Sequence, residues 1–259
     1  MKKLAIASAL LSTLAITGTA AHAYQAEVGG SVGYIDPDNG SGSASFGVDG
    51  TYYFKPVQTR NAPLAEAAFL DRASNVNAKY NYDEVGDDKR HNYGVGVEYF
   101  VPNSDFYVSG NVGRDELKFK YGSDFDTTTY GAEVGYLPAP GLLIAAGIKG
   151  YDNDFHDGVD PTIRAKYVTT LSNGKDINLE AGAAFGDLDE WNVAADYYID
   201  KTLSVGVDYY DNDMNENSEF GVTARKFFTP QVSLEGRVGF GEVGNNDYNK
   251  FSIAAKYRF

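Results

Sequence analysis

Apolar and polar side chains alternate along most of this chain, and that alternation limits the folds open to it. The last strand shows the pattern, because Phe251, Ile253, Ala255, Tyr257 and Phe259 fall on one face and the residues between them are mostly polar. Successive side chains of a strand point to opposite faces of a sheet. The pattern therefore predicts an all-β protein whose sheet separates an apolar surface from a polar one.

The first 23 residues have a different character and are expected to be removed. Lys2 and Lys3 form a basic start, residues 4–16 are apolar except for Ser and Thr, and Ala21-His22-Ala23 supplies a small-x-small cleavage pattern. This is typical of a secretory signal peptide, since a membrane anchor needs about 20 apolar residues. We expect cleavage after Ala23 and one mature domain over residues 24–259, with the net charge changing from −14 to −16.

The alternating pattern recurs in fourteen segments of the mature chain. No stretch after the signal peptide is long and apolar enough for a membrane-spanning helix, and only a closed barrel crosses lipid without helices while pairing its backbone groups. An even strand number returns both ends to one side of the membrane. The strands are expected near residues 24–36, 42–54, 75–82, 91–100, 106–121, 127–136, 142–152, 162–170, 177–186, 191–199, 203–212, 219–227, 232–242 and 247–259.

The polar face of these strands carries too many charges for a dry core. Charged groups are almost never fully buried unless they are paired, so this face is expected to line a water-filled lumen. A soluble sandwich could place the same face outside, but it would then need a second sheet or helices to fill its core. The predicted pore-lining residues are Glu27, Asp49, Lys79, Glu98, Glu133, Lys149, Arg164, Lys166, Glu180, Asp196, Asp208, Arg225, Glu235, Arg237, Lys256 and Arg258.

Aromatic residues stand at both ends of many apolar faces. Tyr24 and Tyr34 bracket the first face, and Tyr93 and Tyr99 bracket the fourth. Amphipathic rings at both ends of lipid-facing strands form the two aromatic girdles of an outer-membrane barrel. The sequence thus predicts a transmembrane antiparallel up-and-down β-barrel in the outer membrane, in contact with its lipid and lipopolysaccharide.

The connections between strands alternate in kind. Short turns with Pro or Asn-Gly alternate with acidic segments at residues 83–90, 152–160, 186–190 and 211–219. With both termini in the periplasm, the acidic segments would face outward and raise the cation concentration at the mouth. The mature chain has two histidines, His91 and His156, which are assigned to predicted loops, so neither is expected on the outer barrel wall.

One connection is too long for its place. Residues 55–74 follow an even strand, where a short periplasmic turn is expected, and the part over residues 61–70 favours a short helix with Pro63 in its first turn. Two arrangements stay open. The segment either decorates the barrel rim, or Leu64, Ala68 and Phe69 fold into the periplasmic mouth and constrict it.

Several motifs resemble a known family. Gly50-Thr51-Tyr52-Tyr53-Phe54-Lys55, the segment Pro63-Leu64-Ala65-Glu66-Ala67-Ala68-Phe69-Leu70, and the end Tyr257-Arg258-Phe259 are similar to the putative general bacterial porin family. The resemblance implies a monomeric or homo-oligomeric barrel that passes small hydrophilic solutes and has no catalytic residues. Phe259, with Tyr257 before it, also resembles the signal recognised by the barrel-assembly machinery, which implies assembly by that route.

Enzyme and metal chemistry find little support in the sequence. The pairs Asp87-Asp88 and His156-Asp157 could suggest an outer-membrane protease, and a lipase would need a histidine on the outer wall, but the surrounding loops are rich in Asp throughout. The acidic runs 152–160 and 211–215 suggest calcium loops, but the required glycine is absent, since position 216 is Glu. Weak divalent-ion or lipopolysaccharide contacts are the alternative to plain solvated loops. We expect no enzyme, no cofactor, no metal site and no nucleic-acid partner.

The resulting prediction is a porin that lets small hydrophilic solutes diffuse across the outer membrane. Eight acids and eight bases in the predicted lumen indicate weak charge discrimination, with a mild cation preference from the acidic loops. Four bases, Arg225, Arg237, Lys256 and Arg258, come late in the chain, so a basic wall facing an acidic wall is a hypothesis. The alternatives are a non-conducting structural or adhesin barrel and, behind it, a barrel hydrolase.

Overall fold

The computed structural model describes residues 23–85, 88–213 and 216–259. Most of the predicted signal peptide, together with Asp87 and Asn215, lies outside these residues. Ala23, the last residue of the predicted signal peptide, is the first residue of β1.

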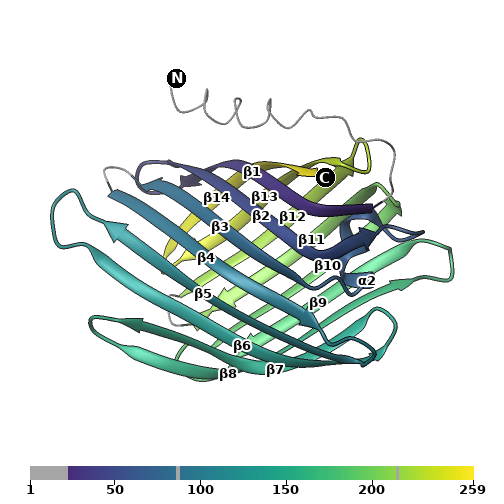
Figure 1. Cartoon of the computed structure of the whole chain (residues 1–259). Helices are drawn as coiled ribbons and strands as arrows, with labels where there is room; N and C mark the ends of the chain where they lie inside the picture. The colour runs from purple at the N-terminus through teal and green to yellow at the C-terminus, as the bar shows by residue number, and fades with distance from the viewer. Residues whose placement is uncertain (1–22, 86–87, 214–215) are drawn as a thin grey trace.

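Fourteen strands form a closed antiparallel barrel (Figure 1). Each strand pairs with its neighbours in the chain, and β14 pairs with β1 to close the ring, with Glu27 opposite Arg258 and Val32 opposite Ile253. The predicted fold class is therefore confirmed. The strands are β1 (Ala23–Pro37), β2 (Ser43–Gln58), β3 (Asn75–Val85), β4 (Asp88–Phe100), β5 (Phe106–Lys118), β6 (Phe125–Ala139), β7 (Leu142–Asn153), β8 (Asp157–Thr170), β9 (Asp176–Ala184), β10 (Glu190–Asp200), β11 (Leu203–Asn212), β12 (Asn217–Phe227), β13 (Val232–Val243) and β14 (Asn246–Arg258).

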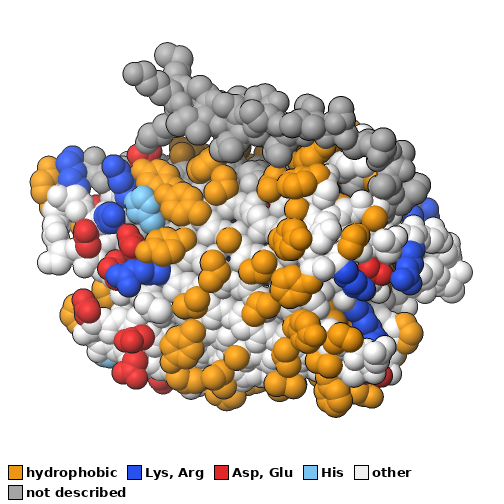
Figure 2. Space-filling model, in the orientation of Figure 1, with side chains coloured by type: hydrophobic (Ala, Val, Ile, Leu, Met, Phe, Trp, Pro, Cys, Tyr) orange, Lys and Arg blue, Asp and Glu red, His pale blue; other side chains and the backbone are white. Residues whose placement is uncertain are grey.

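Apolar side chains cover the outside of the barrel. Val32, Val95, Val134 and Ile253 are each at least half exposed and lie on the predicted lipid face. Figure 2 shows such side chains as a band across the middle of the visible face, with charged side chains gathered toward its two ends. A belt of this kind is stable in hydrocarbon and would be costly in water.

Strand bounds follow the sequence prediction closely, with two larger differences. The second strand ends at Gln58 instead of residue 54, and the eighth begins at Asp157 instead of residue 162. The added parts contain Pro56 and Pro161, although Pro removes a ladder donor and is uncommon within strands. The earlier start of β8 makes the acidic connection before it shorter than expected, so that only residues 154–156 separate β7 from β8.

The barrel has two unlike ends. The terminal end holds Ala23, Phe259 and the connection between β2 and β3, and the opposite end is called the distal end below. Residues 59–74, called the inner segment, contain the short helices η1 (Leu64–Glu66) and α2 (Ala67–Leu70). Among the described residues, no helix has the length and apolar character needed to cross a membrane.

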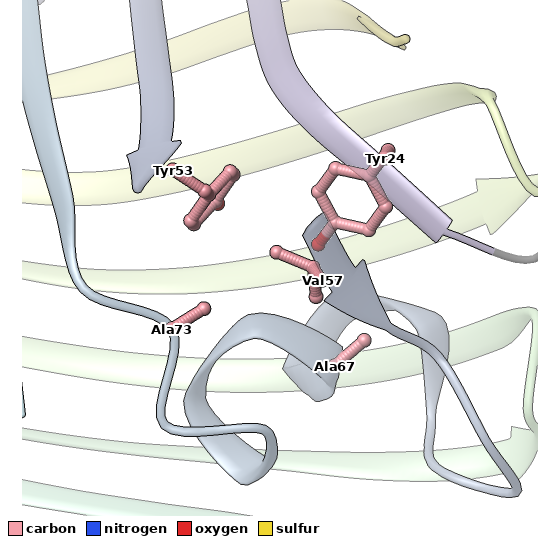
Figure 3. Close-up of a cluster of buried hydrophobic side chains, with 5 residues drawn as sticks. All are labelled: Tyr24, Tyr53, Val57, Ala67 and Ala73. Atoms are coloured by element: carbon pink, nitrogen blue, oxygen red, sulfur yellow. The ribbon is translucent and has the colours of Figure 1, made fainter. Parts of the chain in front are cut away.

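The inner segment enters the barrel and packs there in two apolar clusters. One contains Tyr24, Tyr53, Val57, Ala67 and Ala73 (Figure 3). Ala68 packs against this first cluster. In the second cluster, Phe69 packs against buried wall residues, which are Phe100, Tyr107, Leu137 and Leu143. The terminal end of the lumen is thus a packed core inside a barrel.

Tyr24 was expected in the lipid-facing girdle, and that expectation is wrong. Its side chain is 5% exposed, and its ring meets that of Tyr53 edge-on at 5.5 Å. The register between β1 and β2 shifts between Tyr24 and Ala26. A bulge interrupts the two-residue alternation, so the side chain before it turns to the other face.

Candidate functional site in the barrel lumen

A cavity of about 460 Å³ lies in the lumen directly against the inner segment, and it is called the chamber below. Ala65, Glu66, Ala68, Phe69 and Ala73 line it from the segment. Residues from twelve of the fourteen strands line the rest, so the chamber occupies the width of the lumen. The predicted pore-lining residues that line it are Glu27, Glu98, Arg164, Lys166, Glu180, Asp196, Arg225, Glu235, Lys256 and Arg258.

The other six predicted residues lie around the chamber or toward the distal end. Asp49 pairs with Lys256 at 3.1 Å, and Glu133 pairs with Arg164 at 2.8 Å. Asp208 and Arg237 form an ion pair beside a second cavity of about 410 Å³. Lys149 is ion-paired with Glu190. Lys79 lies opposite Asp49 on the neighbouring strand and forms no ion pair with any described residue.

Arg258 joins the barrel seam to the inner segment. Its side chain lies between the rings of Phe227 and Tyr24, with ring centroids 4.5 and 4.6 Å from the guanidinium carbon. Nε donates to Glu27 at 2.5 Å, and Nη1 donates to the carbonyl oxygen of Leu64 at 2.8 Å. A single buried side chain therefore connects β14, β1, β12 and η1.

Glu66 holds the opposite side of the segment to the far wall. It is 5% exposed, pairs with Lys166 at 2.8 Å, and accepts a hydrogen bond from the Tyr198 hydroxyl at 2.7 Å. Lys166 also pairs with Glu180 at 2.6 Å and lies 5.2 Å from the Phe69 ring centroid. Burial of these charges is tolerated because each has opposite charge and hydrogen-bond partners.

The backbone of the segment is fixed at the same wall. Leu64 N–H donates to the carbonyl of Lys201, at 2.8 Å, in the turn between β10 and β11. Thr202 stabilises this turn by donating to Asp200 from its hydroxyl and its N–H, at 2.6 and 2.7 Å. These hydrogen bonds, the hydroxyl's first, hold the pKa of the Asp200 carboxyl below its ordinary value. The segment thus starts at β2 and reaches across to β10 and β11.

Buried Asp71 fixes the return of the segment to the wall. It accepts a hydrogen bond from the Gln58 N–H at 3.1 Å and pairs with Arg60 at 3.1 Å and with Lys55 at 3.6 Å. Arg72, the next residue, pairs with Asp105 of the β4–β5 turn at 2.9 Å. Both ends of the inner segment are therefore attached to the rim.

The three residues predicted to constrict the mouth have different positions. Leu64 contributes its backbone, donating to Lys201 and accepting from Arg258. Ala68 and Phe69 pack in the two apolar clusters and also line the chamber. A segment lying on the barrel rim would not make these contacts.

Two chamber carboxylates, Glu98 and Asp196, differ from the others because they form no ion pair with any described residue. Glu98 accepts hydrogen bonds from Asn75 and from the Tyr107 hydroxyl, at 2.8 and 2.9 Å. Asp196 accepts one from Asn178 at 3.2 Å. The chamber holds six carboxylates and five basic side chains, so it carries one net negative charge.

Bases and acids are interleaved around the lumen. Arg225 on β12 pairs with Glu235 on β13 at 2.5 Å, and Arg237 on β13 pairs with Glu219 and Asp208 on the two preceding strands. The hypothesis of a basic wall facing an acidic wall fails on these strands, because each late base has a carboxylate on a nearby strand.

Three acids in these networks were not predicted. Glu190 lies one residue before the predicted strand 191–199, and Glu219 begins the predicted strand 219–227 on the face of Arg225, so alternation could have included both. Glu66 had a weaker signal, as the one charged residue in an otherwise apolar run from Leu64 to Leu70. Its partner Lys166 is 100 residues away in sequence, and alternation cannot indicate such a contact.

The histidines behind the enzyme alternatives lie in different parts of the barrel. His91 was not expected on the outer wall, and that expectation is wrong, because it shares the face of Tyr93 and Val95 on β4. Its Nδ1 is hydrogen-bonded to the Tyr80 hydroxyl at 2.9 Å, not to a serine. His156 is exposed at the distal end. Buried Asp160 accepts hydrogen bonds from the N–H groups of residues 187 and 188.

Comparison with known proteins agrees with this geometry. The chain is similar to the outer membrane protein Omp33 of Acinetobacter baumannii, with 28% identity over 92% of this chain and 99% of that chain and a TM-score of 0.71. Two further likenesses show the fold alone. A FadL homologue of Pseudomonas aeruginosa is 10% identical over 91% and 90% of the two chains, with a TM-score of 0.57. A mutant of TodX, a monoaromatic hydrocarbon channel, is 9% identical over 92% and 91%, with a TM-score of 0.52.

No curated protein matches the chain. The model of the family described as putative general bacterial porin matches residues 1–150 and 144–259, which together span the sequence. The charged lumen and apolar outer face are the features that such a protein requires. The chain therefore belongs to the putative general bacterial porin family, and its fold is that of an outer-membrane β-barrel.

Proposed function

We propose that the chain forms a narrow water-filled channel for passive diffusion of small hydrophilic solutes across the outer membrane. The observation that carries the proposal is the chamber, a cavity of about 460 Å³ lined by eleven charged side chains inside a barrel with an apolar outer face. Charged groups need water or partners, and a wet lumen is a route for solutes. Catalysis has no role in this proposal.

The terminal end faces the periplasm, and the inner segment sets the width of the channel there. Contacts of Leu64, Glu66 and Phe69 support this role, because they join the segment to walls on opposite sides of the lumen. Solutes pass between the segment and the wall, so the expected conductance is small. The channel prefers cations mildly, which the net negative chamber and the unpaired carboxylates Glu98 and Asp196 support.

Export and assembly complete the proposal. Cleavage after Ala23 would release a mature chain whose first residue, Tyr24, packs inside the barrel. Phe259 is exposed at the terminal end, with its ring 6.1 Å from that of Tyr257, where the assembly machinery could bind both. The outer apolar belt contacts membrane lipid, the distal rim contacts lipopolysaccharide, and the barrel is compatible with a monomer or a homo-oligomer.

Single-channel recording of the refolded mature protein in a planar bilayer tests the function. We expect small discrete steps and a modest cation-selective reversal potential in a KCl gradient. Replacing residues 60–72 with a short Gly-Ser linker should raise the step size several-fold. A silent wild-type protein that conducts only after this replacement would favour the plugged structural barrel instead.

Cysteine modification gives a second test that keeps the segment in place. The chain has no cysteine, so a single introduced thiol is the only target of a charged methanethiosulfonate. Modification of Ala65→Cys or Ala254→Cys, which both line the chamber, should reduce the conductance. The control Ala132→Cys lies on the exposed outer face and should leave it unchanged. Equal currents before and after modification at all three sites would contradict the proposal.

A further inference from the structure

The chamber carboxylate Glu98 is not ion-paired with the guanidinium of Arg164, which lines the same chamber. Arg164 donates from Nε to both oxygens of Glu133, at 3.0 and 2.8 Å, and from Nη2 to the Tyr107 hydroxyl at 3.1 Å. The same hydroxyl donates to Glu98 at 2.9 Å. Tyr107 therefore lies between a cation and an anion that both line the chamber.

A second such arrangement lies on β10 and β12. Asp196 and Arg225 line the chamber together, but the Arg225 Nε donates to Glu235, and Asp196 has only the amide of Asn178. Asn178 is 2% exposed, and its Oδ1 has no hydrogen-bond partner. Asp196 thus lines the chamber as a carboxylate without an ion-pair partner among the described residues, which favours an added ammonium group.

A solute with both charges fits this lining better than one with a single charge or none. A single charge meets nearly equal numbers of like and opposite groups, and a neutral solute cannot form charge-assisted hydrogen bonds, which are about twice as strong as neutral ones. A small zwitterion can place its ammonium at Glu98 or Asp196 and its carboxylate at Arg164 or Arg225. About fifteen waters would fill 460 Å³ at roughly 30 Å³ each, so an amino acid fits with part of its hydration.

We propose that the chamber is a selectivity site for small zwitterions of the α-amino-acid class. The inference rests on the proposed channel function and adds the solute class to it. Glu98 and Asp196 hold the ammonium group, and the guanidinium groups of Arg164 and Arg225 hold the carboxylate. The ion pairs that already join neighbouring strands stay in place and keep the site from collapsing.

Liposome swelling with two isomers tests the proposal. Serine is a zwitterion, and glyceramide has the same atoms without formal charge, so size and composition are matched. After subtraction of protein-free liposomes, we expect serine to enter about three to ten times faster, the effect of one charge-assisted contact of about 1 kcal/mol. The double variant Glu98→Gln/Asp196→Asn should bring the ratio close to one by slowing serine alone.

The matched control removes two carboxylates elsewhere. Glu242 and Asp247 face each other on the β13–β14 hairpin and are exposed at the distal rim. Glu242→Gln/Asp247→Asn should keep the wild-type ratio. A wild-type ratio near one in a protein that conducts KCl would overturn the zwitterion site and leave the channel intact. Absence of both KCl conductance and solute entry would overturn both proposals.

A measurement on the unaltered protein avoids any folding defect of the variants. Serine added to a planar bilayer should cause brief interruptions of the KCl current that become more frequent with concentration. Glyceramide at the same concentration should not. Identical current traces with the two isomers would contradict the site even if the variants could not be refolded.

Discussion

The two ends of the lumen are formed by the same strands but differ in how deeply their ion pairs are buried. At the terminal end, the Arg258–Glu27 pair is almost fully buried, with side chains 7% and 8% exposed. At the distal end, Arg90 pairs with Asp115 while 54% of the arginine side chain is exposed. The terminal lumen also holds two apolar clusters around the inner segment. One end resembles the core of a soluble protein, and the other is a wet, charged rim.

This difference teaches where stability and where selectivity reside. Buried pairs act in a low dielectric, and losing one partner leaves an uncompensated charge. Exposed pairs are screened and contribute little. Substitutions at the terminal end should therefore change the free energy of unfolding and the width of the channel. Substitutions at the distal end should mainly change how ions approach it.

The largest expected effect comes from Arg258→Ala. Removal of the guanidinium leaves Glu27 buried without its main partner, takes away the donor to the Leu64 carbonyl, and opens space between Tyr24 and Phe227. We expect the free energy of unfolding to fall by about 3–5 kcal/mol, as for other broken buried pairs. Urea titration of the protein refolded in liposomes, followed by tryptophan fluorescence of Trp191, measures it.

The matched change at the distal end is Arg90→Ala. Because more than half of the Arg90 side chain is exposed, loss of this pair should cost less than about 1 kcal/mol in the same titration. Equal losses for Arg258→Ala and Arg90→Ala would contradict the division of the lumen into a core and a rim.

A somewhat smaller effect is expected from Leu143→Ala. Leu143 is buried in the cluster that packs against Phe69, so its truncation leaves a cavity that the rigid wall cannot fill, at a cost of about 2–4 kcal/mol. Leu234→Ala, on the outer face, should cost about 1–2 kcal/mol, since acyl chains fill the space and only the transfer part is lost. The two variants are compared in one liposome preparation. A larger loss for Leu234→Ala would show that the inner cluster is loosely packed.

Much of the fold could be predicted from sequence because its signal is local. Alternation within each strand indicates the two faces without knowledge of any partner, and hairpin pairing then follows from chain order. Local signals failed where the chain departs from alternation. The bulge beside Tyr24 reverses one side chain, and the strands that contain Pro56 and Pro161 continue past residues that usually end a strand.

The lumen networks depend on contacts between distant residues, and only part of them could be predicted. The sixteen charged residues were named from their face alone, without their pairing. The contacts of Glu66 with Lys166 and of Arg258 with Leu64 join residues 100 and 194 positions apart. No sequence periodicity relates these residues, because the inner segment is neither a strand nor a long helix. Its position is decided by packing within the closed barrel.

The smallest expected effect is on the salt dependence of ion selectivity, which distinguishes charges at the rim from charges in the chamber. Glu242→Gln/Asp247→Asn removes rim charges in free solution, whereas Glu98→Gln/Asp196→Asn removes charges inside the chamber. The Debye screening length is about 10 Å at 0.1 M salt and about 3 Å at 1 M. The rim variant should therefore reduce cation preference at 0.1 M and not at 1 M, while the chamber variant reduces it at both. Reversal potentials in KCl gradients of equal ratio and different mean concentration measure this. If the chamber variant also matched wild type at 1 M, ions would be selected at the rim alone, and the chamber would select only by size.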